Sequence, residues 1–192
     1  NNNNNNNDDN PSAARGPRIA IVDIDVHHGN GTEEIVRNLV PNTTFLPTPS
    51  SWAPVSELSH KPWLDEDDPS HVFFASINLF AEDRFYPCSG NDSDNWAAAA
   101  TPAATPAVTA ATCSPGVPRV INVGLTPIGP GPWDQRARRA LSAKSRAELV
   151  AAGSAEMRHK VSTQLLPAMR DFQPDLLLLS SGFDAHHEDM YH

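Results

Sequence analysis

Short apolar runs alternate with helical and irregular stretches along this chain, which is the pattern typical of an α/β fold. Four runs are apolar enough to predict buried strands, at residues 19–22, 71–78, 119–125 and 175–181. Strands buried on both faces occur mainly in parallel sheets covered by helices. The last run is uninterrupted at Leu176–Leu179, and we expect it to be a central strand.

Two stretches show the three-to-four-residue spacing of an amphipathic helix. The first helix is expected to begin with Thr32 as N-cap and to end before Pro41. The second helical region starts near residue 133 or 135, and Pro167 predicts a kink within it. The expected core-facing positions are Ile35, Val36, Leu39 and Val40 in the first helix, and Met157, Val161, Leu165, Met169 and Phe172 in the second.

Three segments lack such patterns. Residues 1–17 are rich in asparagine and are predicted to be disordered. Residues 42–70 are rich in Pro, Ser, Thr and Trp and are interpreted as a loop or variable insertion. Residues 91–118 are of low complexity, with alanine runs and Thr-Pro-Ala repeats, and predict a flexible insertion.

The composition narrows the function classes. A net charge of −9 and a pI near 5.2 argue against direct nucleic-acid binding and favour a lysine-rich substrate through steering. The only two cysteines, Cys88 and Cys113, suggest a reducing compartment. No apolar run approaches membrane-spanning length. We therefore expect no membrane partner and a location in the nucleus, the cytoplasm or both.

Polar side chains with metal-binding chemistry follow the first apolar run. Asp23, Asp25 and His27 are spaced by two, so in a continuing strand they share one face at its C-terminal end. Open α/β sheets place their ligands at that edge. Two carboxylates and an imidazole there are costly to desolvate without a cation, and zinc accepts this mixture. The alternative is a turn-forming Asp-x-Asp with surface histidines.

Three motifs resemble one known family. D-I-D-V-H-H-G-N-G-T at residues 23–32 resembles the signature of the zinc-dependent histone deacetylases, particularly the class II branch, which has asparagine at the position of Asn30. Residues 75–87 resemble that family's strand and Phe-Pro loop, and residues 174–185 resemble its P-D-L-x-L-x-S-x-G-F-D-A motif. The resemblance implies a three-layer α/β/α fold with a mostly parallel sheet, arginase/deacetylase-like. Residues 18–192 would then be a partial domain, incomplete at both ends.

The resemblance also implies roles for individual residues. Zinc would be held by Asp25, His27 and Asp184, and Asp23 and Asn30 would orient the family's tandem histidines. Phe85 and Tyr86 would line the tunnel for the acyl-lysine. A structural potassium ion would be held by Ser76 and the Ile77 carbonyl, together with backbone oxygens of Asp23, Asp25 and His27. Without the resemblance, Asp184 could simply cap a helix, and His186, His187 and His192 could in principle bind metal.

The implied activity is zinc-dependent hydrolysis of acetyl-lysine in histones or other proteins, which yields free lysine and acetate. Acetylated histone tails and a corepressor complex would be the partners, and repression of transcription the outcome. The family's tandem histidines and its oxyanion-binding tyrosine are expected outside this chain, so we assign it no catalytic residue. The alternative function is therefore a catalytically inactive deacetylase-like interaction domain.

Two further alternatives use other metals. An aspartate-nucleophile phosphohydrolase would use Asp23 and Asp25 with magnesium, but it needs a later G-D-x-x-x-D that Gly182-Phe183-Asp184 does not supply. An arginase-like hydrolase with two manganese ions needs more bridging carboxylates than Asp184 alone. Metal identity and stoichiometry separate these hypotheses.

Overall fold

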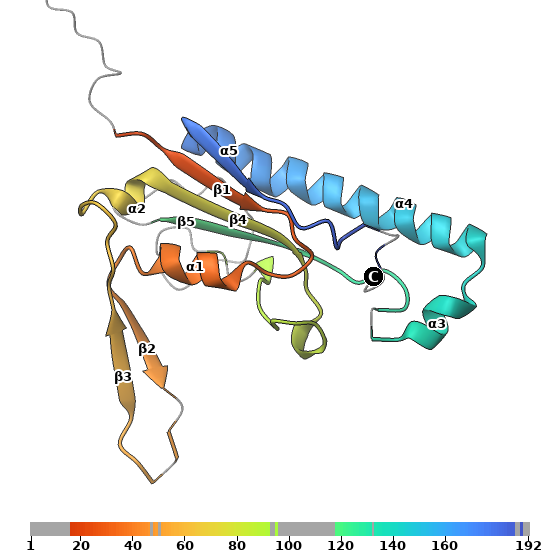
Figure 1. Cartoon of the computed structure of the whole chain (residues 1–192), viewed down its shortest axis with the longest axis horizontal. Helices are drawn as coiled ribbons and strands as arrows, with labels where there is room; N and C mark the ends of the chain where they lie inside the picture. The colour runs from red at the N-terminus through yellow and green to blue at the C-terminus, as the bar shows by residue number, and fades with distance from the viewer. Residues whose placement is uncertain are drawn as a thin grey trace, which may run out of the picture.

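A four-stranded parallel sheet forms the centre of the computed structural model, which describes residues 16–46, 48–49, 51–92, 95, 118–131, 133–186 and 189. The strand order is β5-β4-β1-β6. All three neighbouring pairs are parallel, which confirms the predicted sheet (Figure 1). The strands are β1 (Ile19–Asp23), β4 (Val72–Leu79), β5 (Arg119–Leu125) and β6 (Leu176–Ser180).

Helices cover both faces of this sheet, so the domain has three layers (Figure 1). One face packs on α1 (Asn30–Arg37) and the residues just after it, where Phe74 and Val120 meet Val36 of the helix and Leu39 beyond its end. The other face carries α4 (Ala143–Lys160), the π-helical segment η4 (Val161–Leu165) and α5 (Leu166–Phe172). Its buried core consists of Ala20, Val22, Phe73, Ala75, Ile77, Val123, Leu165 and Phe172. The alternation along each strand produces the two cores, and the expected α/β/α architecture is confirmed.

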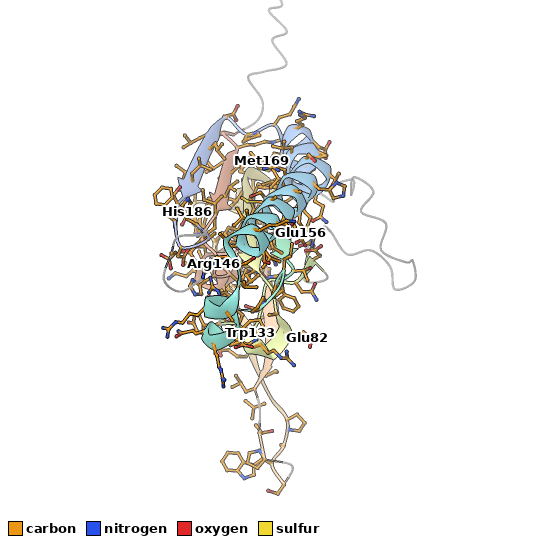
Figure 2. All side chains as sticks on the ribbon, turned by 90° about the vertical axis from the view of Figure 1, so that its right-hand side faces the viewer. Glu82, Trp133, Arg146, Glu156, Met169 and His186 are labelled. Atoms are coloured by element: carbon orange, nitrogen blue, oxygen red, sulfur yellow. The ribbon has the colours of Figure 1, made fainter. Side chains whose placement is uncertain are left out.

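The second helical region is divided into several helical segments, and capping residues and Pro167 mark the boundaries. The short helix α3 (Gln135–Ala140) is capped by Asp134, and Ser142 caps α4 by accepting a bond from Ser145 N. Glu156, labelled on α4 in Figure 2, accepts a hydrogen bond from Thr126 N just after β5. The π-helical segment immediately precedes the turn that contains Pro167, which has no N–H to donate, and it marks the predicted irregularity.

The predicted apolar stripes are largely confirmed, with two exceptions. Leu165 and Phe172 are buried, and Val161 and Met169 pack against the same core. Met157, however, is exposed, as is Ile35 in the first helix. That helix also begins at Asn30, with Gly29 rather than Thr32 as N-cap. Both exposed side chains lie at the border of their stripes, where the spacing alone does not decide burial.

The interpretation of residues 42–70 as a loop is wrong in part. Strands β2 (Asn42–Leu46) and β3 (Val55–Ser59) form an antiparallel hairpin that projects from the sheet (Figure 1). The short helix α2 (Asp68–His71) follows and leads into β4. The Asp68 carboxylate accepts hydrogen bonds from the N–H groups of Trp63, Leu64 and Asp65 at 2.6–3.2 Å, which fixes the turn ahead of α2.

The last strand, predicted to be central, is not central in the sheet that the described residues form. Within the described sheet, β6 is an edge strand beside β1, and the side chains of Leu176–Leu179 remain 45–59% exposed. A continuous apolar run indicates that both faces are suited to burial, but it does not place the strand within the sheet.

Most of the two segments predicted to be flexible lies outside the described residues, namely 1–15, 93–94 and 96–117. Where the second segment is described, it is attached to β5. Asp92 accepts a hydrogen bond from Gly124 N, and Asn95 accepts one from Asn122 N. None of the described helices combines the length and the apolar character needed to span a membrane.

Candidate metal centre

Three side chains with metal-binding chemistry meet at the C-terminal edge of the sheet. Among the described residues, Asp25, His27 and Asp184 form the group whose ligand atoms all lie within 4.8 Å of one another. Nδ1 of His27 lies 2.9 Å from Asp25 Oδ1 and 2.9 Å from Asp184 Oδ2. The structure thus brings together the three residues that the sequence motifs select.

The backbone explains how they meet. β1 ends at Asp23, and Asp25 and His27 lie in the bend that follows, so they do not share one face of a continuing strand as expected. Asp23 instead accepts a hydrogen bond from Asp25 N at 3.1 Å, and Asp25 accepts one from His27 N at 2.7 Å. These two side-chain turns shape the bend.

Asp184 comes from the end of the neighbouring strand. β1 and β6 are parallel, so both chains leave the sheet at the same edge. Ile24 N donates to Ser180 O at 2.9 Å, and Val26 N donates to Asp184 Oδ1 at 3.1 Å, which directs the Asp184 carboxylate toward the bend.

Because Gly182 has no side chain, the Asp25 carboxylate can occupy the space beside it. A Cβ built on Gly182 would overlap Asp25 Oδ2 and lie 2.6 Å from its Cγ. A glycine at this position therefore allows the two strand ends to approach closely.

The donor set fits a metal ion. Two carboxylate oxygens and an imidazole nitrogen are ligands that zinc accepts, and three protein ligands leave one coordination position open. The side chains of His27, Asp25 and Asp184 are 41%, 34% and 25% exposed, so the centre is accessible from solvent. His186, which lies beyond Asp184 beside the sheet, is not part of this group (Figure 2). His187 and His192 lie outside the described residues.

The residues expected to hold potassium lie where the end of β1 pairs with the middle of β4. Asp23 and Ser76 are register partners, and both are buried. Ser76 Oγ accepts a hydrogen bond from Gly29 N at 3.3 Å, and Ile77, the next residue of β4, is buried as well. Asn30 is exposed in the first turn of α1. The binding of potassium by Ser76 and Ile77, and the orientation of catalytic histidines by Asp23 and Asn30, remain predictions.

Aromatic rings flank the candidate metal ligand His27. The Phe85 ring stacks on the imidazole with centroids 5.1 Å apart and planes at 10°, and the Tyr86 ring lies edge-on at 6.2 Å. Both residues follow the 3₁₀ helix η2 (Glu82–Arg84). Tyr86 is 74% exposed, so its ring extends the apolar surface beside the centre outward.

A buried polar network lies behind the centre, and the sequence patterns did not reveal it. His28 Nε2 lies 2.8 Å from Glu33 Oε2, and Asn122 Nδ2 donates to the same oxygen at 2.9 Å. Arg37 Nε donates to the other carboxylate oxygen at 2.7 Å. The available signal was a polar residue, Asn122, within an otherwise apolar strand.

The network controls the ionisation of Glu33. Burial alone raises the pKa of this carboxyl, but hydrogen bonds from His28, Asn122 and Arg37, together with the Arg37 charge, lower it more. The net pKa is below the ordinary value, so Glu33 is a carboxylate at neutral pH.

The chain is similar to known proteins over most of its length. An uncharacterised protein of Synechocystis is 28% identical over 90% of the chain, which covers 32% of that relative. The type-2 histone deacetylase 2 of Dictyostelium discoideum is 26% identical over 90% of the chain, which covers 6% of that relative. The crystal structure of an acetylpolyamine aminohydrolase from Burkholderia pseudomallei is 21% identical, with a TM-score of 0.46 over 92% of the chain and 31% of the relative. The chain thus spans a third or less of these relatives. The sequence model of the histone deacetylase domain matches residues 11–192, and the chain belongs to this family.

Proposed function

We propose that this chain forms the metal-binding part of a zinc-dependent hydrolase that removes acetyl groups from protein lysines. The observation that carries the proposal is the Asp25–His27–Asp184 group at the C-terminal edge of a parallel sheet. Family membership supports hydrolysis of an amide of this kind. A zinc ion bound there supplies a Lewis acid for the amide carbonyl and makes water acidic enough to provide hydroxide near neutral pH.

The chain's own residues would bind and orient the substrate. The Phe85 ring stacks on the His27 imidazole and the Tyr86 ring lies edge-on to it, and this apolar surface beside the centre suits the four-carbon stem of a lysine side chain. The exposed centre admits a side chain from another protein, and the net charge of −9 favours approach of lysine-rich segments such as histone tails. A corepressor assembly in the nucleus, with repression of transcription, is the setting we propose.

The metal is tested first, on the complete natural protein. We expect one zinc ion per chain by elemental analysis, and its loss in Asp25→Ala and Asp184→Ala. Glu148→Ala is the matched control, because this acidic side chain is 66% exposed on α4. Full zinc occupancy in both site variants contradicts the ligand assignment, whereas one magnesium ion or two manganese ions support the phosphohydrolase or the arginase-like alternative.

Activity is tested next, as release of acetate from an acetylated histone-tail peptide. We expect turnover that requires zinc and disappears in Asp184→Ala. An acetylated diamine serves as the competing substrate, and a preference for it would replace protein lysine with a small amine as the substrate. Zinc binding without turnover on either substrate would make the chain a deacetylase-like interaction domain.

A further inference from the structure

His28 is buried beside a candidate metal ligand and uses both of its ring nitrogens. Its side chain is 3% exposed, whereas the side chain of His27 is 41% exposed. Its Nε2 lies 2.8 Å from Glu33 Oε2, and its Nδ1 lies 2.7 Å from Ser89 Oγ. His28 therefore connects the first helix with the chain segment that carries the two aromatic rings.

The carboxylate decides which nitrogen carries the proton. Ionised Glu33 has no proton to donate, so Nε2–H of His28 donates to it. In the neutral ring, Nδ1 then accepts the hydrogen bond from the Ser89 hydroxyl. Asn122 on β5 and Arg37 on α1 hold Glu33 in place, so the orientation of the ring is fixed by the body of the domain.

Residues 85–90, which we term the aromatic loop, are attached at two points to the segment that follows β1. At one end Phe85 stacks on His27. At the other end Ser89 binds His28, and a Cβ on Gly90 would lie 2.7 Å from His28 Cγ. Gly90 has a φ of +90°, and its carbonyl accepts a hydrogen bond from Asn78 Nδ2 at 3.2 Å. Two consecutive histidines thus hold opposite ends of this loop.

We propose that His28 is a positioning residue: through Ser89 it holds the aromatic loop so that Phe85 and Tyr86 flank the metal centre, and it thereby governs substrate binding. This inference rests on the proposed function. Loss of the hydrogen bond between Ser89 and His28 leaves the candidate metal ligands unchanged, since neither residue belongs to the Asp25–His27–Asp184 group. It removes one of the attachments that place the two rings, so the affinity for an apolar substrate stem falls.

Two isosteres of His28 separate this role from simple support of the core. The shorter His28→Asn places an amide near Nδ1, where its oxygen accepts from Ser89, but it leaves Glu33 without that donor. The longer His28→Gln places its amide near Nε2 and keeps the Glu33 bond at the expense of Ser89. We expect His28→Gln to raise KM about tenfold with little change in kcat, the equivalent of one buried hydrogen bond. His28→Asn should raise it less.

Ser89→Ala tests the same contact from the loop side. We expect the same rise in KM, and no further rise when His28→Gln is added, because both changes remove the same hydrogen bond between His28 and Ser89. Ser142→Ala, which alters a helix cap away from the centre, is the serine control. Measured on the complete zinc-loaded protein, a KM that Ser89→Ala leaves unchanged, or that His28→Asn raises as much as His28→Gln, would falsify the proposal.

Hydrogen exchange supplies a readout that needs no turnover. Cys88 N donates to Phe85 O at 2.8 Å within the aromatic loop, and its protection reports how firmly the loop is held. We expect faster exchange of this amide in Ser89→Ala and His28→Gln at unchanged zinc content. If the protein binds zinc but hydrolyses no acetylated substrate, the proposed function fails. Hydrogen exchange then tests the role of His28 independently of the proposed function. Unchanged protection of the Cys88 amide in both variants overturns that role.

Discussion

Gly182 and Asp25 are in such close contact that a side chain at residue 182 would collide with the Asp25 carboxylate. A Cβ at Gly182 would lie 2.6 Å from Asp25 Cγ and closer still to Oδ2. Asp25 also accepts a hydrogen bond from His27 N and lies 2.9 Å from the His27 ring. A displacement of Asp25 therefore moves two of the three candidate ligands.

We predict that Gly182→Ala weakens zinc binding by about 10–100-fold, the range typical of changes that misplace a metal ligand. Calorimetric titration of the metal-free protein with zinc measures the effect. Gly153→Ala is the control, because a Cβ at Gly153 meets nothing within 4 Å and alanine favours a helix interior. Equal zinc affinities of the two variants would show that Asp25 does not hold the metal.

Phe172 joins the end of α5 to the sheet. Its ring is buried, lies 5.4 Å from the Phe73 ring, and has the guanidinium groups of Arg18 and Arg119 at 5.5 and 5.8 Å from its centroid. Arg18 Nη1 also donates to Phe172 O at 2.8 Å. The residue thus combines apolar burial with two cation–π contacts.

We predict that Phe172→Ala lowers the free energy of unfolding by about 3–5 kcal/mol, as expected for loss of a buried aromatic ring. Urea unfolding measures the change. Phe183→Ala should have an effect within about 0.5 kcal/mol, since Phe183 is 79% exposed. A similar loss in both variants would contradict the packing described for Phe172.

The sequence was sufficient to predict the sheet because strands depend on local patterns, and the resemblance to the deacetylase family supplied the candidate ligands. Apolar runs located the four strands, and the parallel pairing of β1 with β6 brought Asp184 to the same edge as Asp25 and His27. The bend after Asp23 was not foreseen. It depends on side-chain to backbone hydrogen bonds, which a strict two-residue alternation does not include.

Contacts between distant segments could not be predicted in this way. Glu33 reads in sequence as an ordinary acidic residue in the first turn of a helix, yet it is the centre of a network that includes His28 and Asn122. No spacing connects residues so far apart in the chain. Likewise, the run Leu176–Leu179 indicated apolar faces but could not show that β6 lies at the edge of the described sheet.

Asp92 anchors the segment after the aromatic loop. Its Oδ1 accepts from Gly124 N at 2.6 Å, and its Oδ2 accepts from Lys160 Nζ at 3.1 Å and Gln164 Nε2 at 3.3 Å. The Lys160 side chain is only 20% exposed, so removal of the carboxylate leaves a partly buried ammonium with its bond to the Gly124 carbonyl but without a counter-ion among the described residues.

We predict that Asp92→Ala lowers the free energy of unfolding by about 1–3 kcal/mol, because partly buried donors lose their acceptor. Glu148→Ala is the comparison. Its ion pair with Lys144 spans 3.9 Å between side chains that are 66% and 87% exposed, and its loss should cost less than about 0.5 kcal/mol. If urea unfolding gives equal losses, Asp92 does not fix this segment.

Glu33 should make the domain sensitive to acid. Its pKa in the folded chain is lowered below 4.5, because the hydrogen bonds and the Arg37 charge outweigh the effect of burial. A group with a depressed folded pKa contributes its stabilisation in full above the unfolded value and loses it as the pH falls through the folded value. We therefore predict that Glu33→Gln has a shallower decrease in unfolding free energy as the pH falls below about 4.5. Urea unfolding at several pH values measures this slope, with the neighbouring, exposed Glu34→Gln as the control. Equal slopes in the two variants would mean that the Glu33 network does not stabilise the ionised carboxylate.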